Sequence, residues 1–213
     1  MSRLVAALIL CLASPMHAIE ITFSPALDPN TAVISGIIPG AQVVWFGVGF
    51  RPLGYESQVE RTTVILTDDD RDGAIIYAPE KAIPVASVWA AIELGSGEYG
   101  TGVPKNSPAR VLDLAADTFR GDAGQAQRLV RHASFSELLL IRPSNGIWTL
   151  TAGDGAVGDS DGVADGRMTN DLRTFQAFEG SPPPPNRLEH GDLVLVVDPY
   201  ALQLSVATFE PGR

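Results

Sequence analysis

The sequence predicts an all-β protein built from two sandwich-like units with little helix. Short apolar segments recur at intervals of about 8–12 residues. Turn residues separate them, since the 213-residue chain contains 16 prolines and 21 glycines. No long stretch shows the apolar period of an amphipathic helix. Short strands joined by frequent turns are typical of β-sandwich architecture.

The first predicted unit covers residues 19–104. Its clearest strand is VVWFGVGF (43–50), which is apolar on both faces and therefore predicts a central strand covered on both sides. Gly47 and Gly49 share a face with Trp45 and leave room for a bulky neighbour. A glycine-rich turn is expected near the end of the unit. Further strands are predicted at residues 60–67, 74–78 and 87–94.

The second predicted unit covers residues 105–213 and follows the seam PKNSPAR (104–110), where Ser107 and Pro108 also suit the start of a short helix. SPPPPN (181–186) predicts a polyproline II crossing, because proline cannot join the interior of a sheet. Strands are predicted at residues 135–142, 146–152, 192–197 and 201–209, and a helical turn or a strand at 169–178.

An immunoglobulin-like topology is our hypothesis for the first unit. The Cys…Trp…Cys spacing of antibody domains is absent, because the chain has one cysteine. The sandwich topology therefore stays open at the level of sequence.

The N-terminal segment MSRLVAALILCLASPMHA has the layout of a secretory signal peptide: one positive charge, an apolar run and a small residue at Ala18. We expect cleavage after residue 18 and a secreted or periplasmic location. The apolar run is too short to span a bilayer, so we expect no membrane insertion after cleavage. Cleavage would also remove Cys11, so the mature chain would have no disulfide.

The formal net charge of −10 argues against nucleic acid and against anionic lipid surfaces. Both of these partners require clustered Lys and Arg side chains, and the sequence has no such cluster. We expect no nucleic-acid partner, and a protein or a glycan stays open as the partner.

The acidic loop DDDRDG (68–73) has the pattern D-x-D-x-D-G. Calcium takes about six to eight oxygen ligands, and alternate carboxylates in a tight loop can converge on one ion. The pattern resembles the first half of an EF-hand calcium loop, although position twelve is Pro79 and Glu80 comes one residue later. The resemblance implies metal ligands among Asp68, Asp70 and Asp72.

A second acidic loop, DSDGVADG (159–166), is similar to the calcium loops of thrombospondin type 3 repeats and dockerins. The resemblance covers about a dozen residues and implies a bound Ca²⁺ with a backbone carbonyl among its ligands. The carboxylates that would ligate the ion are Asp159, Asp161 and Asp165.

As a whole, the chain resembles exported bacterial β proteins.

Both acidic loops have an alternative interpretation as plain turns. Asp-Gly pairs favour tight turns, because Asp accepts local backbone hydrogen bonds and Gly adopts positive φ. A turn needs one Asp, whereas neighbouring carboxylates repel by about 1 kcal/mol per pair even in water. Calcium as a structural cofactor and plain turns both stay open.

No catalytic residue can be assigned from the sequence. His132 and His190, the histidines after residue 18, lie in no H-E-x-x-H motif, and no G-x-S-x-G motif is present. GSGEYG (95–100) matches G-x-G-x-x-G but lacks the following helix that a phosphate site needs. Trp45, Trp89 and Trp148 fall within predicted strands and are expected in the core, which leaves Tyr55, Tyr99 and Tyr200 as loop candidates.

These patterns predict an exported, non-catalytic protein of adhesion, recognition or structural type, stabilised by calcium. The alternative is a secreted hydrolase acting on glycans. Such an enzyme would use paired carboxylates whose separation is a three-dimensional property.

Overall fold

A computed structural model describes residues 18–24, 31–53, 56–113, 119–120, 127–131, 137–144, 146–151, 167–199 and 201–209. Within these ranges the regular structure is β-strand, apart from the 3₁₀ helix η2 (Leu172–Thr174). The all-β prediction is confirmed. No helix in the described ranges is long and apolar enough to cross a membrane.

The strands of the described residues form four sheets. The front sheet has the order β1 (Glu20–Ser24), β2 (Thr31–Ser35), β5 (Ala74–Tyr77). The central sheet has the order β4 (Glu56–Thr67), β3 (Gln42–Leu53), β6 (Ser87–Glu93), β7 (Tyr99–Gly102). The back sheet has the order β14 (Gln176–Ala177), β12 (Gly146–Thr151), β11 (Glu137–Arg142), β15 (Leu193–Asp198), β16 (Gln203–Thr208), β8 (Arg110–Asp113). A small sheet contains β13 (Arg167–Asp171), β10 (Gln127–Arg131) and β9 (Phe119–Arg120).

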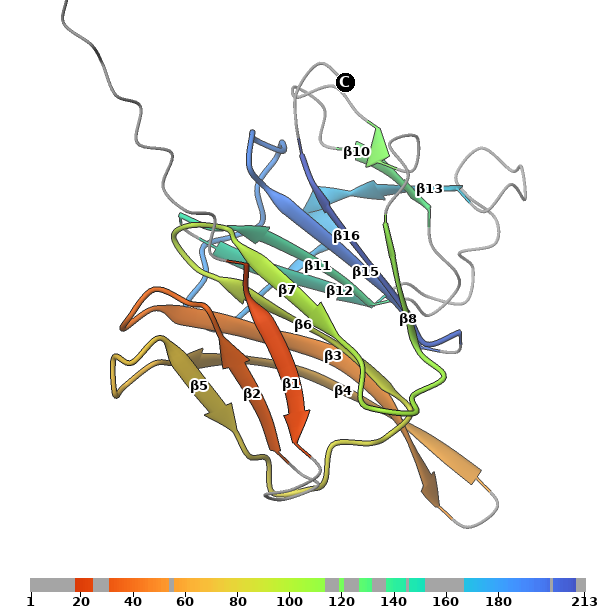
Figure 1. The fold of residues 1–213 in the computed structure, drawn as a ribbon. Helices are drawn as coiled ribbons and strands as arrows, with labels where there is room; N and C mark the ends of the chain where they lie inside the picture. Colours follow the sequence, from red (N-terminus) through yellow and green to blue (C-terminus); the bar gives the residue numbers. More distant parts are fainter. Residues whose placement is uncertain are drawn as a thin grey trace, which may run out of the picture.

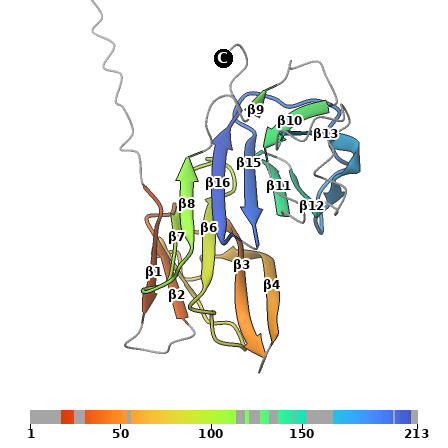
Figure 2. The ribbon, with the colours of Figure 1, turned by 90° about the vertical axis from the view of Figure 1, so that its right-hand side faces the viewer.

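The central sheet lies between the front sheet and the back sheet (Figures 1 and 2). Its strand β3 is buried on both faces from Val43 to Val48, as the two-sided apolar pattern predicts. Side chains on one face pack against the front sheet, and those on the other face pack against the back sheet. The sequence pattern of this strand therefore follows from its position in the middle layer.

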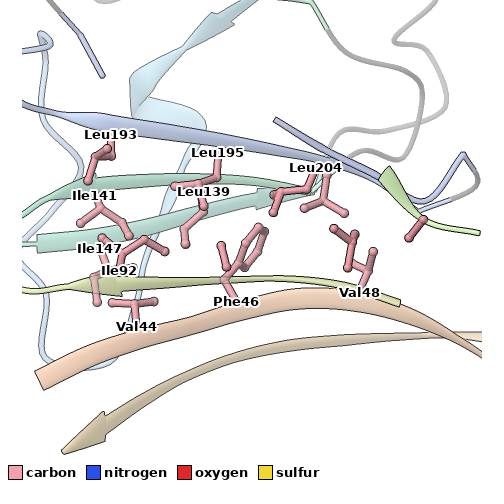
Figure 3. Packing of buried hydrophobic residues seen from close by; sticks show 14 of the residues in the cluster. Val44, Phe46, Val48, Ile92, Leu139, Ile141, Ile147, Leu193, Leu195 and Leu204 are labelled. Atoms are coloured by element: carbon pink, nitrogen blue, oxygen red, sulfur yellow. The ribbon is translucent and has the colours of Figure 1, made fainter. Parts of the chain in front are cut away.

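The core between the central and back sheets contains residues from both predicted units (Figure 3). Val44, Phe46 and Val48 of β3 meet Leu139 of β11 and Leu195 of β15, and all five are at most 4% exposed. The boundaries of the two units stay a prediction. Their apolar faces nevertheless share one core in the described structure.

The prediction that Gly47 and Gly49 leave room for a bulky neighbour is confirmed by the packing on their face of β3. A Cβ atom added at Gly47 would lie 2.4 Å from Cε3 of Trp89, and one added at Gly49 would lie 2.9 Å from Cγ of Pro84. The Trp89 indole stacks on Trp45 with 5.0 Å between ring centroids and an interplanar angle of 11°. The two glycines thus accommodate bulky groups that a side chain would displace.

The outer face of the back sheet is covered by its own cluster of buried side chains, which includes Trp148, Leu172 and Phe175. The Trp148 indole donates a hydrogen bond of 2.8 Å to the carbonyl of Pro182, which fixes the proline-rich crossing against the sheet.

Arg142 forms a bidentate ion pair with the buried Asp192, with both N–O distances 2.8 Å.

Two segments differ from the expectations. Residues 110–113, where a short helix was expected after Ser107 and Pro108, form β8 and pair in parallel with β16. Residues 169–178 combine both expected alternatives, since they contain the end of β13, the 3₁₀ helix and β14. In each case pairing with strands distant in sequence decides the outcome, and such pairing is invisible to local propensity.

Candidate functional site

The first acidic loop is organised around Asp68, which turns inward and is 2% exposed. Its Oδ2 accepts hydrogen bonds from the backbone N–H groups of Gly40 and Gly73, each at 3.0 Å, and Oδ1 accepts one from Asp72 at 3.3 Å. The bond from Gly40, followed by those from the loop itself, lowers the pKa of Asp68 below its usual range despite burial. This carboxylate connects two loops through backbone amides.

Asp70 and Asp72, in contrast, are exposed. Oδ1 of Asp72 accepts a 3.0 Å hydrogen bond from the N–H of Ala74, a local turn contact. The structure therefore does not bring the three predicted ligands of this loop together. Among the residues that the structure describes, no group of three or more His, Cys, Asp or Glu side chains is placed to hold a metal ion. The predicted ligands of the second loop, Asp159, Asp161 and Asp165, lie outside the described residues.

A cleft of about 460 Å³ lies beside β4, and we call it the β4 cleft. Five consecutive residues of β4, 58–62, line it together with Tyr77, the segment 79–84 and Trp89. Successive residues of a strand point to opposite faces. A cleft lined by five in a row therefore follows the edge of the strand.

The outer wall of the β4 cleft, residues 79–84, is held by two hydrogen-bonded contacts. Nη2 of Arg51 donates to the carbonyl of Ala82 at 2.6 Å. The hydroxyl of Ser87 donates to the carbonyl of Pro84 at 2.5 Å and accepts from Nε1 of Trp89 at 2.7 Å. The wall is thus fixed to β3 and β6, so the cleft is preformed.

Arg51 and Glu60 form a bidentate ion pair at the β4 cleft, with N–O distances of 2.5 and 2.8 Å. The hydrogen bond from Arg51 holds the pKa of Glu60 below its usual value, and burial opposes this shift only in part. The same bond raises the pKa of Arg51. At neutral pH Glu60 is therefore an ionised, positioned hydrogen-bond acceptor.

The inner wall of the β4 cleft is aromatic. Tyr77 packs against Trp45 with ring centroids 5.3 Å apart, and Trp45 stacks in turn on Trp89. Burial raises the pKa of Tyr77, so its phenol stays protonated and can donate a hydrogen bond. Trp45 and Trp89 are buried, as predicted, and so is Trp148.

Sequence reasoning did not find the β4 cleft. The signals that exist are the pair Gly47 and Gly49, which predict a bulky neighbour on that face, and the alternating strand that ends at Thr67. Of the tyrosines proposed as loop candidates, Tyr99 is 40% exposed but is the first residue of strand β7, so its assignment to a loop was wrong. Tyr55 and Tyr200 lie outside the described residues. His190 is exposed in a turn.

Comparison with known proteins gave no match, either to a family model or to a curated protein sequence.

Proposed function

We propose that this chain is an exported, non-catalytic recognition protein of β-sandwich architecture that binds its partner at the β4 cleft. The observation that carries the proposal is the cleft itself: its volume of about 460 Å³ is within the range of about 300–1,000 Å³ that is usual for ligand sites. Its outer wall is held in place by hydrogen bonds before any ligand binds. A preformed wall lowers the entropy cost of binding.

The strand order supports an immunoglobulin-like sandwich for the first unit. In the seven-stranded form of this fold the first, second, fourth and fifth strands share one sheet and the third, sixth and seventh share the other, to which variable-type domains add two edge strands. The front sheet β1-β2-β5 and the central sheet β4-β3-β6-β7 follow this order except at the fourth strand, since β4 lies at the edge of the central sheet, where variable-type domains add strands. Export remains a proposal that rests on the signal-peptide pattern of residues 1–18.

The electrostatics of Glu60 argue against a role for this side chain as the general acid of glycan hydrolysis. A glycosidase needs one carboxylic acid whose pKa is raised, so that it can protonate the leaving group. The pKa of Glu60 shifts in the opposite direction because Arg51 is hydrogen-bonded to it. Glu60 is therefore suited to fixing the cleft wall through Arg51 and unsuited to general-acid catalysis.

The proposal is tested by blocking the cleft. The full chain is screened against a random nine-residue linear peptide library and a glycan array, and each ligand is measured again with Thr62→Trp, which fills the cleft. Thr67→Trp is the matched control, because Thr67 is an exposed residue of the same strand outside the cleft. We expect binding that Thr62→Trp abolishes and Thr67→Trp preserves.

Ligands that bind both variants equally, or no ligand at all, would refute the β4 cleft as the recognition site. Release of reducing sugar from any array glycan, lost in Glu60→Gln, would establish the hydrolase alternative instead.

A further inference from the structure

We infer that the partner is an extended polypeptide that pairs with the edge of β4 and inserts an uncharged side chain into the β4 cleft. This inference rests on the proposed function and names its ligand class. In the described structure β4 is the terminal strand of the central sheet and pairs with β3 alone. Its twelve residues make it a long edge.

The direction of the free main-chain groups follows from the hydrogen-bond register. Phe50 donates its N–H to the carbonyl of Ala86, and Leu94 donates to the carbonyl of Gln42, so the even-numbered residues of β3 bond to β6. Antiparallel pairs alternate between bonded and non-bonded positions. The odd-numbered residues of β3 therefore bond to β4.

Those odd-numbered residues pair with the even-numbered residues of β4. The N–H of Asp68 donates to the carbonyl of Ala41, which continues the same register. The main-chain groups of the odd-numbered residues Val59, Arg61 and Thr63 consequently point outward, away from β3. They provide a row of donors and acceptors that an added strand can use.

The β4 cleft lies along this row. It is lined by residues 58–62, about 16 Å of strand. Glu60 and Thr62 pair with Gly49 and Gly47, so they share the face on which Trp89 packs. Side chains of an added strand opposite Glu60 or Thr62 would project over the same face, toward the aromatic inner wall.

The chemistry of the cleft favours a peptide over a glycan. Sugars usually stack on an open aromatic face, but Trp89 is 3% exposed and covered by Trp45. The cleft is lined by two acidic and two basic side chains, Glu60, Glu80, Arg61 and Lys81. Arg61 is further paired with Glu137 of the back sheet. Such a charge-balanced edge suits main-chain recognition of an uncharged segment.

The test uses the tightest binder from the nine-residue linear peptide library, resynthesised with one N-methyl group at each position in turn. N-methylation removes a single main-chain donor. We expect losses of about tenfold or more at alternate positions, and little change at the positions between them, because successive N–H groups of a paired strand point in opposite directions. Affinity is measured with the unmodified full chain.

A protein variant gives the complementary measurement. Val59→Pro removes one outward N–H without touching the bonds from β4 to β3, and Val59→Ala is the matched control that keeps the donor. We expect Val59→Pro to lower the affinity for the peptide by about tenfold and Val59→Ala to lower it less than threefold. If Val59→Pro fails to fold, the N-methyl series decides alone.

The outcomes separate this inference from the proposed function. Ligands that Thr62→Trp blocks but whose N-methyl series shows no alternation would overturn strand addition and leave the cleft as the site. Cleft-dependent glycans without cleft-dependent peptides would do the same. A concentration-dependent dimer that Val59→Pro abolishes would identify a second copy of this chain as the occupant and would overturn the peptide.

Discussion

Gly47→Ala is the substitution whose cost the structure specifies most directly. The added Cβ atom would lie 2.4 Å from Cε3 of Trp89 and 2.4 Å from the carbonyl oxygen of Val88. Ordinary contacts begin at 3.4 Å, so these neighbours must retreat by about 1 Å. Retreat is difficult, because Val88 belongs to the paired strand β6 and the Trp89 ring is stacked on Trp45.

The magnitude follows from two opposing contributions. Overpacking in a well-packed core costs about 1–3 kcal/mol. Replacing Gly by Ala restricts the unfolded chain and returns about 0.4–1 kcal/mol. The difference spans about 0–2.6 kcal/mol, and since two contacts are as short as 2.4 Å we expect a net loss in its middle part, about 1–2 kcal/mol in the free energy of unfolding. For a chain of this size the loss corresponds to a decrease in Tm of about 2–8 °C.

The assay is chemical denaturation of the full chain, with Gly49→Ala as the matched control. Gly49 lies on the same strand and face, but its added Cβ would lie 2.9 Å from Pro84, so its loss should be smaller. Trp89→Leu completes a double-mutant cycle with Gly47→Ala. We expect the double variant to lose at least about 0.5 kcal/mol less than the sum of the single losses. Equal losses at the two glycines, or strict additivity, would refute the packing argument.

Three further predictions concern charge. Asp68→Asn should lower Tm at neutral pH and make the decrease of Tm in acid less steep. Because the folded pKa of Asp68 lies below 3.8, the stabilisation by this carboxylate is complete above that value and is lost as pH decreases through the folded pKa. Thermal melts across the acid range check this prediction. Asp192→Ala should destabilise the chain in urea unfolding by less than the about 3–5 kcal/mol of a fully unpaired buried charge, because Arg142 loses Asp192 but keeps its contact with Glu189. Arg142→Leu/Asp192→Leu should recover part of that loss. Calcium at a hundredfold excess over Kd should stabilise the chain by about 2.7 kcal/mol, and Asp159→Asn/Asp161→Asn should abolish the shift; a melt unaffected by calcium would reduce that loop to a charged turn.

The central layer was the most predictable part of the fold. The two-sided apolar run in 43–50 predicted a strand covered on both faces, and the structure extends it to Gln42–Leu53 as β3. The strand β8 could not be predicted in the same way. Its four residues, RVLD, carry no clear period, and they become a strand only because β16, far along the chain, pairs with them in parallel.

The candidate site was less predictable than the fold. The acidic pattern at 68–72 identified a turn rich in carboxylates. It could not indicate that Asp68 would bond to Gly40, a residue 28 positions away on another loop. The β4 cleft depends on where Tyr77 and residues 79–84 lie relative to the edge of β4. No residue spacing in the sequence predicts these relative positions, whereas Gly47 and Gly49 do predict the packing of a bulky group beneath the cleft.

The same glycine pair connects the stability of the central layer to the binding site. Gly47 leaves space for the Trp89 indole, and Trp89 donates to Ser87, whose hydroxyl holds the carbonyl of Pro84. Pro84 in turn packs over Gly49 and fixes the end of the cleft wall. A side chain at Gly47 would therefore disturb both the core and the cleft. It follows that Gly47→Ala should lower both the stability of the fold and the affinity for any ligand of the β4 cleft. A substitution in the core between the central and back sheets, such as Leu139→Ala, should lower stability and leave the affinity of the folded protein unchanged.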